Sequence, residues 1–403
     1  MQILKWVTLG FGALCLMAVA VALHAFQLFF ISALLIALPA SSYLMGWLTL
    51  KGLQFERRLP PVAWEGETGT VTYLVHNSSR IPRFFLSFRD NWPIMIVPQD
   101  YDTPLMNVPS EGDAGQISHI RFLRRGVYTP DTFYATALDP MGIFSFSLSI
   151  KSTDEIVVYP SPIHPGDLPD SGAERFGWQE FLFSVMRGVS VDPDGVRPYI
   201  AGDPLRRIHW RQTARTGKMI VREFEETFTS NVVIIVESLN RDSTLNETPL
   251  LDYQTRLAAG VADHIIRSGA TVRLITTSPG MNTLFRDTGE GRGDEHHLIM
   301  LDALARADRD AVCDIKQVLE DGIGYLRPGS LIIIICHSSD PSIAQTLAAY
   351  TGSGITVAVV RAQLEISESA QSDAFIAELS AVNVHTFQRT LSEEQTKRYG
   401  SNE

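Results

Sequence analysis

The chain has 403 residues, 45% of them hydrophobic, with a formal net charge of −11 at pH 7. A chain of this length is too long for one ordinary core, so more than one domain is expected. Two of the 34 basic residues and none of the 45 acidic residues precede position 52, so the formal net charge of the remaining residues is −13. This acidic balance excludes a general nucleic-acid binder, which needs a basic face to displace counterions. The three cysteines, Cys15, Cys313 and Cys336, are too few and too apolar in context for a disulfide framework or a zinc site.

An uncharged stretch at the start of the chain contains two apolar runs, Trp6–Leu23 and Leu28–Leu50. Each run approaches the roughly 20 residues that a helix needs to cross a bilayer. A helix satisfies its own backbone hydrogen bonds, as lipid requires. The pattern therefore predicts a transmembrane helical hairpin over residues 1–51, with the lipid bilayer as its partner.

Basic residues flank both ends of this stretch, at Lys5 and at Lys51, Arg57 and Arg58. The positive-inside rule then places both ends in the cytoplasm. This predicts an inner-membrane protein with two spans and a large cytoplasmic domain. The alternative is a cleaved signal peptide, with Lys5 in its charged region and 20–22 (Ala-Val-Ala) as a cleavage site. The second span would still leave the large domain in the cytoplasm.

The next region, residues 52–165, has an apolar period of two. In one run Val71, Tyr73 and Val75 alternate with their neighbours, and short runs of this kind are separated by turn-forming residues. Several short strands at such spacing predict an antiparallel β-sandwich-like domain.

The most specific stretch is residues 197–226, RPYIAGDPLRRIHWRQTARTGKMIVREFEE, within a connecting segment at residues 166–230. Charges this dense are costly to bury unless each is paired. The pattern predicts a helix over Leu205–Arg215 and a strand over Met219–Phe228. The candidate site residues are Arg197, Tyr199, Gly202, Asp203, Arg206, His209, Trp210, Arg215, Glu223 and Glu225.

Two interpretations of these residues are open. In the first, Arg–carboxylate pairs clamp the β-rich domain to the domain that follows, because Arg suits bidentate pairing. In the second, charged residues of the stretch converge on a ligand, for example an anion. His209 could then serve as a general base, because its ordinary pKa lies near neutrality.

Residues 231–403 alternate between apolar runs and helical patterns, which predicts an α/β domain with a mostly parallel, doubly wound sheet. Asp294 is expected to cap the second helix. Strands are expected at Asn231–Glu237, Thr271–Thr276, Leu331–Cys336, Thr356–Arg361 and Val384–Phe387, and helices at Asp252–Arg267, Glu295–Ala305, Asp314–Tyr325, Pro341–Tyr350 and Ser372–Ser380.

Taken in order, Arg-x-Tyr-x-x-Gly-Asp, Arg-x-Ile-His-Trp, Ala-Arg and an acidic strand resemble the bacterial domain of unknown function 58 (DUF58) family. Residues 124–128 and 139–144 resemble the region upstream of this signature. The resemblance implies that residues 231–403 form a divergent von Willebrand factor A-like domain. It also implies association with a MoxR-type AAA+ ATPase and with other membrane proteins.

A von Willebrand factor A-like domain implies a metal site, Asp-x-Ser-x-Ser, after its first strand, where hard oxygen ligands suit Mg²⁺ or Ca²⁺. The equivalent residues here are Glu237, Leu239 and Arg241. Leu has no ligating atom and Arg has the wrong charge, so this degenerate site is predicted to hold no metal. No other cofactor is expected. Glu237 and Ser238 could keep a polar pocket at the carboxyl ends of the strands.

The sequence and the resemblance together favour a membrane-anchored, non-enzymatic interaction or adaptor protein. It would work with a MoxR-type AAA+ ATPase in assembly or in envelope-related functions. One alternative is a hydrolase-type enzyme that uses Asp203, His209 and Glu223. The other is a metal-dependent adhesion module, which Leu239 and Arg241 disfavour.

Overall fold

The computed structural model describes residues 2–100, 104–164, 177–178, 180–182, 187–200, 208–228, 231–240, 248–364 and 370–391. The chain divides into two compact units, Met1–Val158 and Tyr159–Glu403. The division at residues 51, 165 and 230 that the sequence suggests remains a prediction.

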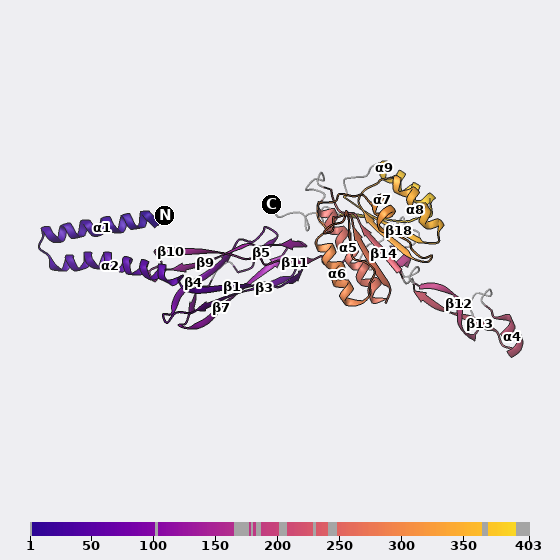
Figure 1. Cartoon of the computed structure of the whole chain (residues 1–403), viewed down its shortest axis with the longest axis horizontal. Coiled ribbons are helices and arrows are strands. Elements are labelled where there is room, and N and C mark those ends of the chain that lie inside the picture. Colours follow the sequence, from indigo (N-terminus) through magenta and orange to yellow (C-terminus); the bar gives the residue numbers. More distant parts are fainter. Residues whose placement is uncertain are drawn as a thin grey trace. The chain divides into compact units, whose positions relative to one another are not determined.

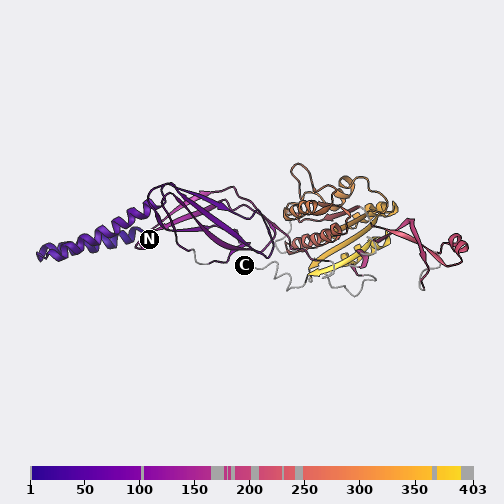
Figure 2. The ribbon, with the colours of Figure 1, turned by 90° about the horizontal axis from the view of Figure 1, so that it is seen from below.

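Unit 1 begins with two apolar helices, α1 (Gln2–Ala22) and α2 (Phe26–Thr49). They lie alongside one another, joined by a turn in which His24 has φ 50° (Figures 1 and 2). Among the described residues, α2 is the one helix long and apolar enough to cross a membrane, and the apolar part of α1 is the shorter Gly10–Ala22. One membrane-spanning helix near the N-terminus is therefore supported.

The rest of unit 1 is antiparallel β-structure, as its alternating pattern predicts. Two four-stranded sheets have the orders β1-β3-β7-β5 and β10-β9-β4-β6, and a small sheet has the order β2-β11-β8. Alternate residues of β3, β4, β7 and β9 form one shared core, which includes Val71, Phe88, Ile120 and Phe133. The strands are β1 (Leu53–Arg58), β2 (Val62–Trp64), β3 (Thr68–Asn77), β4 (Arg83–Asp90), β5 (Ile96–Pro98), β6 (Met106–Val108), β7 (Gly112–Phe122), β8 (Gly126–Tyr128), β9 (Thr132–Leu138), β10 (Ser145–Lys151) and β11 (Ile156–Tyr159).

The last turns of α2 pack against the β9–β10 hairpin. The Tyr43 ring lies 5.4 Å from the Phe144 ring and 5.0 Å from the Phe146 ring, between centroids. Gly46 permits this approach, because a Cβ at that position would lie 2.7 Å from Phe146 Cε2. The end of α2 is thus part of the β-domain's packing.

A carboxylate joins the same two elements. Asp139, 2% exposed, accepts a hydrogen bond from the Ser42 hydroxyl of α2. It also accepts the backbone N–H of Phe144 at 2.6 Å and that of Met141 at 3.2 Å. A buried carboxylate needs such donors, because burial without them is very costly.

A second buried ion cluster lies inside the β-domain. The side chains of Arg57 and Asp90 are fully buried and 2.5 Å apart, and Asp154 lies 3.1 Å from Arg57 Nε. The Tyr73 hydroxyl donates to Asp90. Burial raises the pKa of both Asp90 and Tyr73, although the bonds from Tyr73 and Arg57 act against the rise at Asp90. The cluster ties together β1, β3 and the end of β4.

Unit 2 contains a six-stranded sheet of order β16-β15-β14-β17-β18-β19. All neighbouring pairs are parallel except β15 with the short edge strand β16. Its strands are β14 (Asn231–Val236), β15 (Thr271–Thr276), β16 (Arg286–Asp287), β17 (Leu331–Cys336), β18 (Thr356–Leu364) and β19 (His385–Leu391). The expected strands are therefore present, and the antiparallel β16 is an addition that the sequence pattern did not predict.

Helices cover both faces of this sheet, which explains the continuous apolar runs of its central strands. One face packs against α7 (Ile315–Gln317), the π-helical turn η4 (Val318–Gly322), α8 (Ser342–Gly352) and α9 (Ala370–Ala381). The other face packs against α5 (Thr248–Arg267) and α6 (Gly293–Ala305), which lie together in Figure 1.

Two details differ from the sequence predictions. The expected helix Asp314–Tyr325 is a short α-helix followed by the π-turn η4, which ends at Gly322. The N-cap of α6 is Arg292, so the prediction that Asp294 caps this helix is wrong. Asp294 lies inside the first turn, where its charge favours the helix dipole.

A separate two-stranded antiparallel ribbon is formed by β12 (Arg187–Pro198) and β13 (Ile220–Phe228). The short helix α4 (Trp210–Thr216) precedes β13 at the end of the ribbon (Figure 1). The helix expected over Leu205–Arg215 is therefore described only from Trp210 onward, and the expected strand agrees closely with β13.

Candidate functional site

The described part of the signature is held to β13 by backbone hydrogen bonds. The Tyr199 N–H donates to the Met219 carbonyl at 2.9 Å, and the His209 N–H donates to the Ile220 carbonyl at 2.8 Å. Ile208 forms an isolated bridge with Val221. These contacts bring the segments before and after residues 201–207 to the same end of the ribbon.

Local bonds at the C-terminal end of helix α4 connect it to β13. The Thr213 hydroxyl accepts the Ile220 N–H at 3.1 Å, and the Gly217 N–H donates to the Thr213 carbonyl at 2.9 Å. Gly217 has φ 68°, a left-handed conformation that favours glycine after a helix. The turn to β13 is therefore set by the sequence itself.

Large side chains at this end of the ribbon are exposed. Trp210 is 66% exposed, Ile200 64% and Met219 48%. Basic side chains stand beside them, and no acid occurs between 208 and 220. We call this surface the signature tip; its residues are Ile200, Trp210, Arg211, Arg215, Lys218 and Met219.

The remaining signature residues are placed only in part. Arg197 lies on β12, and Glu223 and Glu225 lie on β13, with their side chains outside the described part. Gly202, Asp203 and Arg206 lie wholly outside the described residues. The clamp and the ligand site both remain predictions.

A second polar site lies at the carboxyl edge of the parallel sheet. The chain passes from β14 to β15 on one side and then to β17 on the other, so the strand order reverses between β14 and β17. In open α/β sheets, ligands bind at such a point. Glu237 follows β14 and His337 follows β17, so both stand at this position.

Glu237 is engaged by the loop after β17. Its Oε2 accepts the backbone N–H of His337 at 2.8 Å and that of Ser338 at 2.9 Å, and His337 Nδ1 lies 3.0 Å away. Burial raises the pKa of Glu237, but His337 and the Ser338 bonds outweigh it, and the net shift is downward. The carboxylate is thus a positioning group for the loop and for the His337 ring.

Small hydroxyl side chains from the ends of β14 and β15 lie at the same edge of the sheet. The Thr277 hydroxyl accepts the Ser238 N–H at 2.8 Å. The hydroxyl oxygens of Ser238 and Thr276 are buried and have no hydrogen-bond partner in the described structure. The edge therefore brings neutral hydroxyls together with the Glu237 carboxylate and the His337 imidazole.

Of the degenerate metal site, the structure describes Glu237 and Leu239. Leu239 is fully buried, and its carbonyl accepts the Ala311 N–H. Arg241 lies outside the described residues. Within the described ranges, no group of three or more His, Cys, Asp or Glu could hold a metal ion.

Glu237 was predicted from the sequence as a site residue, but His337 and the bonds between the two residues were not. The available signal was polar residues directly after a buried strand, at 337–339 after β17. Parallel strands bring such residues to one edge of the sheet.

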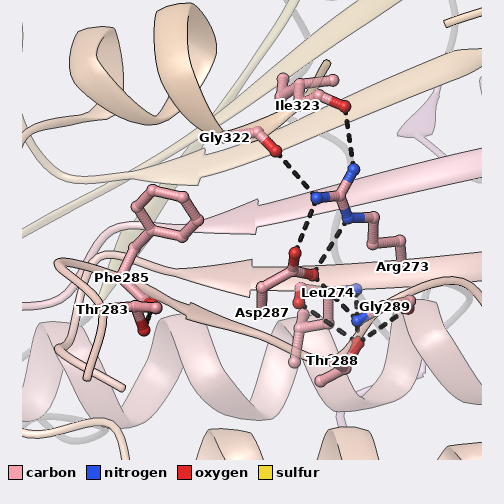
Figure 3. Close-up of polar contacts among 9 residues, drawn as sticks. All are labelled: Arg273, Leu274, Thr283, Phe285, Asp287, Thr288, Gly289, Gly322 and Ile323. Atoms are coloured by element: carbon pink, nitrogen blue, oxygen red, sulfur yellow. Dashed lines mark hydrogen bonds and ion pairs between the residues drawn. The ribbon is translucent and has the colours of Figure 1, made fainter. Parts of the chain in front are cut away.

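A third polar cluster lies between β15 and the edge strand β16, as Figure 3 shows. The Arg273 guanidinium of β15 lies between the Asp287 carboxylate and the carbonyls of Gly322 and Ile323 (Figure 3). The Gly289 N–H donates to Asp287 at 2.9 Å. Burial raises the pKa of Asp287, but the bonds from Arg273 and Gly289 outweigh it and lower the pKa. All donors and acceptors here serve each other, so the cluster is structural.

The comparisons with known proteins agree with the signature. The profile of the family described as "Protein of unknown function DUF58" matches residues 195–365, which include the signature from Arg197 onward. The uncharacterized protein YeaD of Bacillus subtilis (strain 168) is 22% identical over 196 residues. That match covers 46% of this chain and 44% of the relative, so less than half of the relative's length is spanned.

Solved structures are similar only at a low level. The PilB minor pilin from Streptococcus sanguinis matches 79% of this chain and 85% of its own at 9% identity and a TM-score of 0.31. A FixG-related protein from Vibrio parahaemolyticus matches 27% of this chain and 98% of its own at 8% identity and a TM-score of 0.19. These scores are too low to assign a fold or a function.

Proposed function

We propose that the protein is a membrane-anchored interaction protein of the DUF58 family, which binds a partner protein through the signature tip. The observation that carries the proposal is the 66% exposure of Trp210 next to Arg211 and Arg215. Trp and Arg are the residue types most enriched where truncation weakens binding between proteins. An enzyme site would instead hold such a ring in a concave pocket.

The charge of the tip indicates the kind of partner. Residues 208–220 around Trp210 contain three basic residues and no acid, whereas the chain as a whole is acidic. A basic patch of this kind selects an acidic surface and speeds its encounter. The family resemblance points to a MoxR-type AAA+ ATPase as that partner, and we retain it as the candidate.

The proposed anchoring uses α1 and α2 as two spans, with the α/β unit in the cytoplasm. The hydropathy of α2 and the basic residues Lys5, Lys51 and Arg57 support this arrangement. The α/β unit would then be a divergent von Willebrand factor A-like domain, which presents the ribbon to soluble partners. A reporter fused after Glu403 should be active in the cytoplasm, and protease attack from outside intact cells would contradict this.

Capture of the MoxR-type ATPase by the full-length protein tests the binding surface. Trp210→Ala should weaken capture by about 2 kcal/mol, on the order of 30-fold in affinity, because hot-spot aromatics contribute this much. Arg215→Glu should weaken it further at low salt, since it reverses a charge.

The matched control is Tyr325→Ala, which removes another exposed aromatic ring, 90% exposed, from the α/β unit. It should leave capture unchanged. Equal capture by wild type, Trp210→Ala and Arg215→Glu would show that the signature tip is not the binding surface.

A further inference from the structure

The β-domain of unit 1 has one end at α2 and the other end far from it. Leu53, just after α2, pairs with Asn77 at one end of β3, and Thr68 at the other end pairs with Arg121. The 10 residues of β3 extend over roughly 30 Å. We call the end of the β-domain next to α2 the helix end and the opposite end the distal end. Each exposed residue of the β-domain can be assigned to one of them.

The turn between β9 and β10 lies at the helix end and extends along α2. The Met141 N–H is 3.4 Å from the Ser42 hydroxyl. Ser42 lies seven residues before Thr49, the last residue of α2. At 1.5 Å per residue, the turn reaches about 10 Å past the end of the helix, toward its apolar middle.

The surface of the β9–β10 hairpin is suited to an apolar environment. From Thr132 to Ile150 the only charged residue is Asp139, which is 2% exposed and accepts bonds from Ser42, Phe144 and Met141. Met141 at the turn is 48% exposed. Strand β10 is a sheet edge, and edges that face water normally carry charges or proline to prevent pairing.

Two residues mark where the bilayer surface meets α2. Lys51 Nζ lies 3.3 Å from the centroid of the Trp47 ring. Trp and Lys are typical of the membrane–water boundary, where the ring sits at headgroup level and the amine reaches water. A helix needs roughly 20 residues to cross the hydrocarbon core, and counted along α2 from Phe26 this length ends close to Trp47. Ser42, and the turn bonded to it, then lies on the lipid side of this boundary.

We propose that the turn 140–142 inserts into the headgroup–acyl boundary of the membrane, so that the β9–β10 hairpin and α2 bind the lipid surface together. The inference rests on the proposed membrane anchoring and adds a second lipid contact to it. The bonds to Asp139 make the insertion feasible, because they satisfy the carboxylate without water. The exposed Met141 side chain is the part that contacts acyl chains.

Fluorescence quenching in vesicles tests the proposal on the full-length chain. In a Cys15→Ala, Cys313→Ser background the remaining native thiol is Cys336, which is fully buried. A polarity-sensitive fluorophore is attached at Met141→Cys, at Leu34→Cys in the middle of α2, or at Ile94→Cys. Ile94 is 77% exposed at the distal end of the β-domain and is the matched control. The vesicles, of phosphatidylethanolamine and phosphatidylglycerol, carry nitroxide lipids labelled near the headgroup or near the chain end.

The three positions should respond differently. Met141→Cys should be quenched more by the shallow nitroxide, Leu34→Cys more by the deep one, and Ile94→Cys by neither. If Leu34→Cys is not quenched, the membrane anchoring itself is wrong and this inference falls with it. If Leu34→Cys is quenched while Met141→Cys behaves like Ile94→Cys, the anchoring stands and the inserted turn is wrong.

Discussion

Arg273 on β15 and Asp287 on β16 form a two-pronged ion pair, with Nε 3.0 Å from Oδ1 and Nη2 2.6 Å from Oδ2. The same guanidinium donates at 2.8 Å to the carbonyls of Ile323 and Gly322. The Arg273 side chain therefore holds together β15 and β16, the only antiparallel strand pair of this sheet within the described chain. It also holds the end of the π-turn.

Removing this guanidinium should destabilise the α/β unit. Arg273→Ala leaves a partly buried carboxylate and two carbonyls without their donor, and we expect a loss of about 2 kcal/mol. Arg273→Lys keeps the charge but cannot reproduce the planar fork, so it should recover only part of the loss. Chemical unfolding of the detergent-solubilised protein measures both.

Arg267→Ala is the control for that experiment. Arg267 pairs with Asp263 one helical turn away, but its side chain is 76% exposed. Such an exposed pair contributes little to stability, because solvent screens it. Equal losses for the two alanine variants would contradict the role assigned to Arg273.

The α/β unit should become less stable at low pH, because Glu237 becomes protonated there. Its folded-state pKa is depressed, so it contributes stability above the unfolded pKa of about 4.3 and loses it as pH falls through the folded pKa. Glu237→Gln keeps an acceptor for the two N–H groups and removes the titration. The urea midpoint of the variant, measured from pH 6 downward, should therefore depend less on pH below roughly pH 4 than that of wild type. Parallel curves would count against the proposed role of the carboxylate.

The buried cluster of the β-domain gives a larger expected effect. Arg57→Ala leaves Asp90, whose side chain is fully buried, without its cation, at a cost of about 3–5 kcal/mol. Arg58→Ala is the neighbouring control. Arg58 pairs with Glu56, but both side chains are more than half exposed, so the change should cost far less than Arg57→Ala, because solvent screens the pair. Thermal unfolding ranks the two variants, and a small effect of Arg57→Ala would mean that the cluster is solvated.

Magnesium should not stabilise the protein through Glu237. An ion bound there would have to displace the His337 and Ser338 N–H groups, and Leu239 is buried in the core. Titration with MgCl₂ should leave the melting temperature of wild type and of Glu237→Gln equally unchanged. A saturable rise at micromolar Mg²⁺ in wild type alone would overturn this, because a ligand of the native state must stabilise it.

The central strands could be read from the sequence because they are buried on both faces. Thr271–Thr276 and Leu331–Cys336 match the predicted residues. Leu331–Cys336 is apolar at every position because helices cover the sheet on both sides, whereas the apolar pattern of Thr271–Thr276 is interrupted by Arg273. The prediction of one helix over Asp314–Tyr325 is wrong because of tertiary contacts. The Leu319 carbonyl accepts the Tyr350 hydroxyl, and the carbonyls of Gly322 and Ile323 accept Arg273. Side chains from other elements therefore donate to these carbonyls in place of the backbone N–H groups of a continuing helix.

The candidate site was harder to predict for the same reason. Glu237 stood out by its position after the first strand, but its partners are backbone N–H groups of residues 337 and 338, about a hundred positions away. No spacing pattern encodes such a bond. The signature residues were found by their order, and their exposure at the tip, as at Trp210, depends on tertiary structure that the pattern does not contain.

The contact between α2 and the β9–β10 hairpin limits how a soluble fragment of this protein can be made. Cutting the chain after Thr49 removes Ser42 from the Asp139 carboxylate and Tyr43 from the rings of Phe144 and Phe146. The uncovered aromatic surface would then lie next to an edge strand whose one charged residue is Lys151 at its far end, a combination that promotes self-association. Fragments intended for crystallisation or binding studies should therefore keep residues 42–49, or replace the exposed aromatic residues of the hairpin with polar ones.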